Sequence, residues 1–235
     1  MPVGDGDAVG DQLPVDSAVA GSTAEPRSPD WGRGRPTYYQ DRHVAEQYDR
    51  RYSTVAGRWK HRRKERLIGS WLRAAGTVLD VACGPGRFHS AQAGCERFAV
   101  DFSHEMLDVH RARHPRARVA RCDAGQLPFA DHSFDAVLCT RFLAHLRGEY
   151  RAGALAELAR VSRGVVIIDA RHRYNLRYVS RWVRRRLGLA KADKLRHTYR
   201  QLHEELSAAG LEIIDKRSMA WGFSARVLIL AQKPA

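Results

Sequence analysis

The chain has 235 residues, enough for one domain of ordinary size with a full core, and a formal net charge of +14. No apolar run approaches the ~20 residues of a membrane-spanning helix, and the N-terminus lacks the basic-then-apolar order of a signal peptide. The four cysteines stand at spacings that match no zinc motif, which favours reduced, packed thiols in a cytoplasmic protein over disulfides or a metal site.

The charge is unevenly placed along the chain. Residues 1–30 hold six acidic residues and one basic residue, and residues 1–36 are rich in Gly, Pro, Ser, Asp and Ala without apolar periodicity. Such a composition predicts a disordered leader, followed by one domain over residues 37–235. The basic excess of that domain indicates an anionic partner. A basic coding bias is the alternative, because 34 of the 40 basic residues are arginine.

A helical pattern runs from residue 42 to 75 with a break near residues 53–57, and strands and helices alternate after it. The predicted strands are 77–82, 96–101, 117–122, 134–140, 164–170, 211–218 and 225–232. The predicted helices are 86–92, 103–114, 144–161, 175–187 and 197–209. This alternation predicts an α/β fold with a seven-stranded, mostly parallel sheet and helices on both faces. The last two strands are joined too closely for a crossover, so we expect them to pair antiparallel.

The turn after the first strand is the most informative motif. Three apolar residues lead into a turn with Gly84 and Gly86, which is typical of a nucleotide-binding site at the end of a strand. The third glycine of the dinucleotide motif G-x-G-x-x-G is missing, because residue 89 is histidine, and no Walker lysine follows. A dinucleotide site and a P-loop are therefore excluded.

Two carboxylates follow the next two strands. In an open α/β sheet, ligands bind at the carboxyl ends of adjacent strands. Asp101 can accept both hydroxyls of a ribose there, and Asp123 can accept from an adenine amino group. The alternatives are a helix N-cap for Asp101, although Ser103 suits that role better, and a solvated loop acid for Asp123.

With these motifs, the chain resembles the class I S-adenosylmethionine-dependent methyltransferases. The resemblance is strongest to the small-molecule branch with type 11-like domains, which includes the ubiquinone and menaquinone methyltransferases. It rests on residues 78–88, 100–107, 122–129 and 133–137, and it covers about residues 45–170. The chain departs from the commonest family pattern at Ala82, where glycine is usual.

The resemblance implies a Rossmann-like class I methyltransferase fold with S-adenosyl-L-methionine as cofactor. It places the methionine end of the cofactor on the turn after the first strand, the ribose on Asp101 and the adenine edge on the turn after the third strand. The implied cofactor residues are Asp80, Ala82, Cys83, Gly84, Gly86, Asp101, Phe102, Met106, Asp123, Ala124 and Thr140.

Methyl transfer needs an aligned acceptor and an enclosed site, and it needs a general base only if the acceptor loses a proton early. The catalytic candidates at the ends of the fourth and fifth strands are His145, His172 and Tyr174. The alternative for His145 is a structural role. Asp169 lies in the same region, and we expect it to pair with Arg171 or Arg173 as readily as to act in catalysis.

Residues 171–209 are predicted to form a basic helical lid between the fifth and sixth strands. Residues 171–200 hold eleven basic residues and one acidic residue, and the helical stretch 175–187 carries Trp182 on its apolar face. The helix before the first strand is equally basic. This pattern favours peripheral contact with an anionic membrane at the inner face and a lipid-like acceptor such as a quinone precursor. The alternative is a solvated face on an ordinary lid.

Three classes of function remain open. The first is an enzyme that methylates a small or lipid-like molecule. The second is a nucleic-acid (RNA) methyltransferase, which the charge favours. Residues 139–142, Cys-Thr-Arg-Phe, argue against it because base-amino methylases have an Asn/Asp-Pro-Pro-aromatic tetrad there. The third is a catalytically silent cofactor-binding protein.

Overall fold

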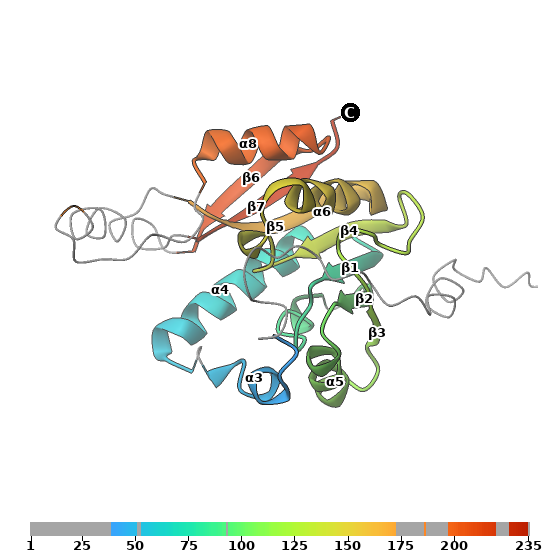
Figure 1. Cartoon of the computed structure of the whole chain (residues 1–235), viewed down its shortest axis with the longest axis vertical. Coiled ribbons are helices and arrows are strands. Elements are labelled where there is room, and N and C mark those ends of the chain that lie inside the picture. Colours follow the sequence, from blue (N-terminus) through green and yellow to red (C-terminus); the bar gives the residue numbers. More distant parts are fainter. Residues whose placement is uncertain are drawn as a thin grey trace, which may run out of the picture.

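A seven-stranded sheet forms the centre of the protein (Figure 1). The computed structural model describes residues 39–50, 53–92, 94–172, 186, 197–219 and 226–234. The strand order is β3-β2-β1-β4-β5-β7-β6. The strands are β1 (Thr77–Val81), β2 (Glu96–Asp101), β3 (Arg118–Arg121), β4 (Phe134–Cys139), β5 (Ser162–Arg171), β6 (Glu212–Ser218) and β7 (Arg226–Gln232). Only β7 runs antiparallel to its neighbours, β5 and β6, which confirms the predicted pairing of the last two strands.

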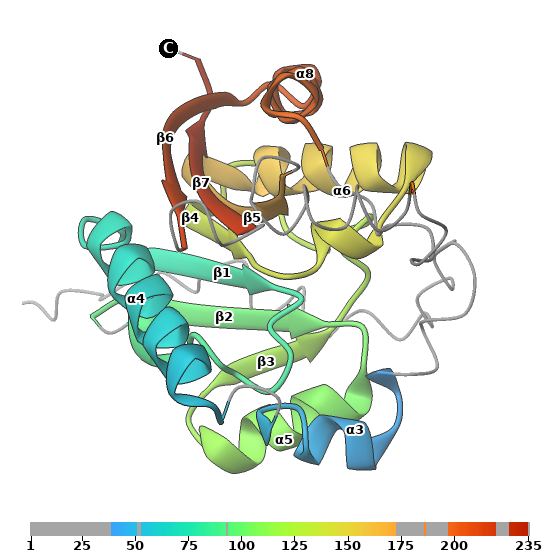
Figure 2. The same cartoon turned by 90° about the vertical axis from the view of Figure 1, so that its left-hand side faces the viewer.

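Helices cover both faces of the sheet, as predicted. They are α3 (Arg42–Glu46), α4 (Val55–Trp71), α5 (His104–Arg113), α6 (Gly148–Val161) and α8 (Tyr199–Ala208), with short 3-10 turns η2 (Ser90–Gln92) and η3 (Leu143–His145). Figure 2 shows α4 crossing in front of β1 and β2, with α6 and α8 near β4–β7. Successive strand residues point to opposite faces, so Leu138 packs with α4 while Val137 and Cys139 pack with α6 and α8. Both faces of β4 are therefore buried, as expected for a parallel strand at the centre of a sheet.

The helix predicted over residues 86–92 is wrong. The chain makes turns over residues 84–89 and only the 3-10 turn η2 follows. Gly86 has φ = 78°, and this left-handed conformation cannot belong to a right-handed helix. The helix predicted from residue 144 also begins later, at Gly148, because η3 occupies its first turn.

Several predictions lie outside the described residues: the leader, the helix over 175–187, Tyr174 and most of the basic lid. Within the described part of the chain, no helix is long and apolar enough to cross a membrane. All four cysteines have free thiols, as predicted.

Candidate functional site

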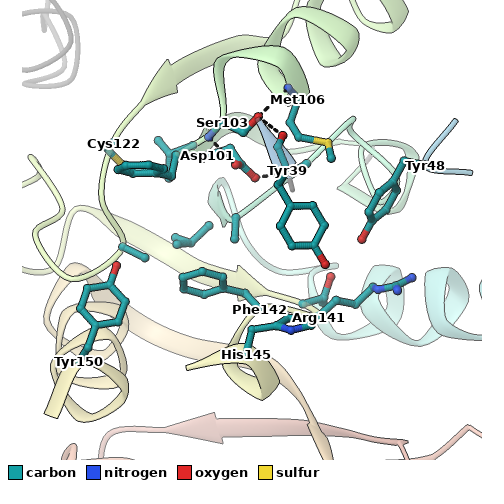
Figure 3. A pocket seen from close by; sticks show the side chains of 17 residues that line it. Tyr39, Tyr48, Asp101, Ser103, Met106, Cys122, Arg141, Phe142, His145 and Tyr150 are labelled. Carbon is teal, nitrogen blue, oxygen red and sulfur yellow. Dashed lines mark hydrogen bonds between the residues drawn. The ribbon is translucent and has the colours of Figure 1, made fainter. Parts of the chain in front are cut away.

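A pocket opens at the carboxyl ends of β1, β2, β3 and β4 (Figure 3). Of the predicted cofactor residues, seven line it: Ala82, Gly84, Asp101, Phe102, Met106, Ala124 and Thr140. Of the three catalytic candidates, His145 lines it. The order of the strands therefore brings together residues from 82 to 145 that are distant in the sequence.

The turn after β1 consists largely of left-handed backbone. Ala82 and Gly84 both have φ = 55°, and Gly86 has φ = 78°. A side chain at Gly86 would be strained by the positive φ. It would also be crowded, because a Cβ there would lie 2.8 Å from ring carbons of His110 and His114. Ala82 adopts a conformation that costs an L-residue roughly 1–2 kcal/mol, which gives a physical reason for the family's preference for glycine at this position.

Asp101 joins the turn after β1 to the end of β2. Its Oδ2 accepts from the backbone N–H of Gly84 at 2.8 Å, and its Oδ1 accepts from that of Ser103 at 2.9 Å. Burial raises the pKa of Asp101, and the backbone N–H donors oppose that rise by stabilising the carboxylate. Asp101 therefore holds the pocket wall in place while its carboxylate stays on the pocket surface.

Ser103 is the N-cap of α5, as the sequence favoured over Asp101. Its Oγ accepts from the N–H of Met106 at 3.1 Å and donates to the backbone carbonyl of Tyr39 at 2.7 Å. The first contact begins the helix, and the second fixes the segment that carries Tyr39 over the pocket.

Asp123 does not line the pocket itself. Its Oδ1 accepts from the N–H of Gly125 at 2.8 Å and from the hydroxyl of Tyr150, which does line the pocket. Burial raises the pKa of Tyr150, and the Asp123 carboxylate raises it further, so this phenol stays protonated. Sequence reasoning missed Tyr150, because no local motif distinguishes a tyrosine in the first turn of a helix.

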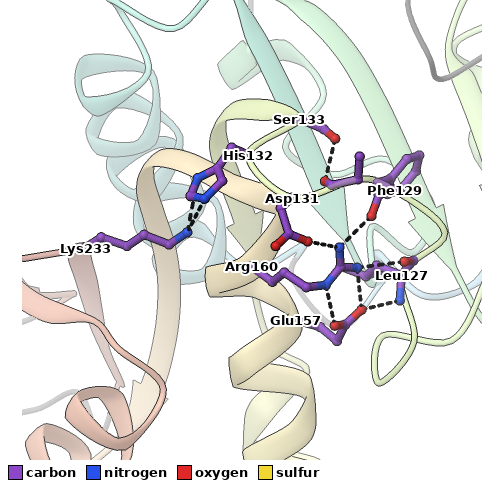
Figure 4. A network of polar contacts seen from close by, with 9 residues as sticks. Leu127, Phe129, Asp131, His132, Ser133, Glu157, Arg160 and Lys233 are labelled. Atoms are coloured by element: carbon purple, nitrogen blue, oxygen red, sulfur yellow. Dashed lines mark hydrogen bonds and ion pairs between the residues drawn. The ribbon is translucent and has the colours of Figure 1, made fainter.

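An arginine on α6 holds the loop between β3 and β4 (Figure 4). Arg160 donates to the carbonyls of Leu127 and Phe129 at 2.9 and 2.7 Å and to the carboxylate of Asp131 at 2.8 Å. Glu157 pairs with Arg160 and accepts from the N–H of Leu127 at 2.7 Å. The loop that begins at Asp123 is thus fixed to α6 by several charge-assisted hydrogen bonds.

Besides Asp123, three more predicted cofactor residues do not line the pocket: Asp80, Cys83 and Gly86. Asp80 is buried in β1. Cys83 and Gly86 lie against histidine rings instead. The Sγ of Cys83 is 3.4 Å from His110 Nδ1, and Gly86 lies against the rings of His110 and His114. Burial raises the pKa of the Cys83 thiol, which keeps it protonated.

The histidine cluster consists of His89, His110 and His114. The Nε2 of His110 lies 3.4 Å from the Nδ1 of His89, and the rings of His89 and His114 stack with centroids 4.0 Å apart. Over the described ranges, no group of three or more His, Cys, Asp or Glu side chains is arranged to hold a metal ion.

The far end of the pocket is aromatic and carries one cation. The ring of Tyr39 lies 6.1 Å from that of His145 and 6.4 Å from that of Tyr48, and the guanidinium of Arg141 lies 5.5 Å from the Tyr48 ring. Phe142 completes this end (Figure 3). Arg141 has φ = 67°, a second strained residue at a strand end. Sequence reasoning missed Tyr39, Tyr48 and Arg141, because no local motif marks them.

Asp169 pairs with other partners than those expected. Its Oδ2 lies 2.6 Å from Lys64 Nζ on α4 and 3.5 Å from a guanidinium nitrogen of Arg226, and its Oδ1 accepts from the N–H of Arg141 at 2.5 Å. Burial alone would raise the pKa of Asp169, but Lys64 and Arg226 outweigh it and lower the pKa to about 2. Asp169 therefore favours the ionised form and accepts from the backbone N–H of Arg141 beside the pocket.

His172 does not line the pocket. It is buried, its ring stacks on that of Tyr199 with centroids 5.2 Å apart, and it forms a parallel bridge with His197. The position favours a structural role. The remaining candidate, Tyr174, is not among the described residues.

Comparison with known proteins agrees with this fold. Residues 79–168 match the sequence model of the methyltransferase domain family. The structure of magnesium protoporphyrin IX methyltransferase from Synechocystis PCC 6803 with bound SAH superposes with a TM-score of 0.69, at 18% identity over 84% of this chain and 97% of that one. The protein thus has the class I methyltransferase fold, and the resemblance to S-adenosylmethionine-dependent methyltransferases is confirmed.

Within that class, the chain is similar to demethylmenaquinone methyltransferases. The one from Renibacterium salmoninarum is 39% identical over 124 residues, 51% of each protein. The one from Corynebacterium glutamicum (strain R) is 38% identical over 107 residues, 45% of this chain and 44% of the relative. The chain thus matches about half the length of these relatives.

Proposed function

We propose that this protein is an S-adenosylmethionine-dependent methyltransferase whose acceptor is a small, aromatic, quinone-like molecule. One observation carries the proposal: a single pocket joins the turn after β1 and Asp101 to the aromatic end formed by Tyr39, Arg141 and His145. The similarity to demethylmenaquinone methyltransferases supports the same acceptor class.

The donor end of the pocket fits S-adenosylmethionine. A carboxylate has about four lone-pair sites, and the two backbone N–H donors to Asp101 use two of them. Acceptor sites remain for the two hydroxyls of a ribose. Phe102, Met106 and Ala124 supply apolar surface for the adenine, and Tyr150 lines the same pocket and donates its hydroxyl to Asp123. When bound, the cofactor supplies an activated methyl group on a sulfonium.

The residues of this chain would then orient the acceptor and exclude water. Tyr39, Tyr48 and Phe142 offer flat faces to a planar ring, and the guanidinium of Arg141 favours an ionised ring oxygen. His145 remains the general-base candidate because it lines the pocket and lies against Tyr39. An ionised oxygen activates an aromatic ring toward an electrophilic methyl carbon, so the acceptor end suits a reduced quinone.

We also propose that the acceptor carries a lipid-like tail and that the protein works at the cytoplasmic face of a membrane. The basic residues of the chain support this, and the acceptor class implied by the relatives is consistent with it.

Transfer of a labelled methyl group tests the proposal. Purified protein is incubated with labelled S-adenosylmethionine and, in separate reactions, reduced demethylmenaquinone, tRNA and rRNA. Label in the quinol that disappears in Arg141→Gln supports the proposal. Label only in RNA would establish the nucleic-acid alternative, and cofactor binding without transfer to any acceptor in a lysate would establish the catalytically silent one.

A further inference from the structure

The exposed side of α4 carries an unusual set of basic side chains. Five of them are exposed, on residues 58 to 66: Arg58, Lys60, Arg62, Arg63 and Arg66. Within the described ranges, none of the five makes an ion pair, whereas some exposed arginines elsewhere do, such as Arg118 with Glu96 and Arg200 with Glu204. The helix has one acidic residue, Glu65, which is turned to Ser90. This face therefore presents positive charge that no acidic side chain among the described residues compensates.

Two large apolar side chains stand among these bases. Val55 is 76% exposed and Trp59 is 47% exposed, and only one other large hydrophobic residue in the described part of the chain, Ile214, is exposed. Val55 and Trp59 are one turn apart and share a face of the helix. The guanidinium of Arg63 lies 5.7 Å from the Trp59 ring. Exposed Trp beside basic residues on one helix face is typical of binding at a membrane–water interface.

The basic end of α4 lies on the pocket side of the sheet. Lys64 is bonded to Asp169 near the carboxyl end of β5, so the turns before Lys64 extend past that edge. Nine residues, 55–63, at 1.5 Å each reach about 13 Å further. Figures 1 and 2 show this end of α4 near α3. In the sequence, α3 lies between Tyr39 and Tyr48, which both line the pocket.

We propose that residues 55–66 of α4 dock on an anionic lipid surface and bring the pocket mouth to it. This rests on the proposed function and names the partner of that site. Five uncompensated positive charges complement an anionic surface, and Val55 and Trp59 enter the interface. The apolar pair favours lipid over RNA, since an aliphatic side chain such as Val55 has no partner on a phosphate backbone.

Co-sedimentation with vesicles tests the proposal on the full chain. We expect binding to phosphatidylglycerol vesicles at low salt, weak binding at high salt, and little binding to phosphatidylcholine vesicles. The triple variant Arg58→Gln/Arg62→Gln/Arg63→Gln should bind about a hundredfold more weakly, because each base contributes about fivefold. Trp59→Ser should bind the vesicles about tenfold more weakly, and this loss of affinity should also be seen at high salt.

A matched control separates this face from net charge. Arg118→Gln/Arg200→Gln/Arg217→Gln removes three exposed bases from β3, α8 and β6 and should bind nearly as well as the unaltered protein. Equal loss in both triple variants, or no binding of the unaltered protein at low salt, would overturn the proposal. A triple α4 variant that loses tRNA binding but keeps vesicle binding would overturn it in favour of RNA.

Separate measurements test the docking surface and the proposed function. The α4 variants touch no pocket residue, so their S-adenosylmethionine affinity and their activity on a short-chain, water-soluble quinol should be normal. If vesicle binding fails while that activity is present, the docking surface is wrong and the proposed function stands. If the unaltered protein binds no S-adenosylmethionine, the proposed function fails whatever the vesicles show.

Discussion

The two ends of the pocket are built by different means. At the donor end, most of the structure is local: a left-handed turn, a carboxylate that accepts two backbone N–H groups, and a helix cap, all within residues 82–106. At the acceptor end, side chains meet across the whole chain, and Lys64 and Asp169 are 105 residues apart in the sequence. Backbone geometry thus determines donor binding, while long-range ion pairs shape the acceptor wall. Changes at one end should therefore leave the other nearly intact.

The largest effect is expected at the acceptor end, for Lys64→Met. It removes one partner of a buried ion pair, whose side chains are only 8% and 5% exposed. Such losses cost about 3 kcal/mol in the free energy of unfolding. Urea unfolding measures this, and S-adenosylmethionine affinity of the folded variant should stay within about twofold. Lys60→Met, an exposed change on the same helix, should cost less than about 0.5 kcal/mol. A larger loss of cofactor affinity than of acceptor turnover would contradict the division of the pocket.

The next effect belongs to the donor end. Asp101→Ala removes the acceptor for two backbone N–H groups and for the ribose, and hydrogen bonds to charged groups contribute about 1.5–3 kcal/mol. We expect S-adenosylmethionine affinity to fall about 50-fold in calorimetry. Asp108→Ala, an exposed carboxylate on α5, serves as the control. Unchanged affinity in Asp101→Ala would remove this residue from the donor site.

Each end also holds one strained residue, Ala82 after β1 and Arg141 after β4. Ala82→Gly should raise the free energy of unfolding by about 0.5–1 kcal/mol, because relief of the left-handed strain outweighs the added freedom of the unfolded chain. Arg141→Gly relieves similar strain but removes the guanidinium. Its KM for the acceptor should rise while its cofactor affinity stays unchanged. If both variants lose cofactor affinity alike, the two ends are not independent.

The smallest effect is a pH dependence at the donor end. Burial, with neighbouring cationic and imidazole groups, lowers the pKa of His89 and of His110 from 6.5 to about 4. The folded protein therefore favours neutral rings, and the unfolded chain takes up protons first. Stability is complete above about pH 6.5 and declines as the pH falls toward about 4. Between about pH 7 and about pH 5, the Tm of His89→Gln should fall by roughly one or two degrees less than the Tm of the unaltered protein. An unchanged slope would show that the ring of His89 does not contribute.

Local pattern explains what could be predicted from the sequence. The strands, the parallel sheet, the turn with Gly84, and Asp101 at the end of β2 follow from short-range periodicity and spacing. The helix expected over residues 86–92 failed because local apolar spacing did not reveal the left-handed backbone at Gly86.

Long-range contacts explain what could not be predicted. The partner of Asp169 was expected among arginines close to it in the sequence, but folding brings Lys64 of helix α4 against it. Tyr150 likewise reaches Asp123 only because α6 packs beside the loop after β3. No pattern of a single segment contains these pairs.

The residues that flank 173–196 contact each other. His172 and His197 form a bridge, the N–H of His197 donates to the carbonyl of Arg171 at 3.0 Å, and the His172 ring stacks on Tyr199. The chain thus leaves the sheet and returns to it at one point, so the length of the intervening piece costs little in closure entropy. A change in the number of residues between His172 and His197 should therefore leave β5 and α8 in place.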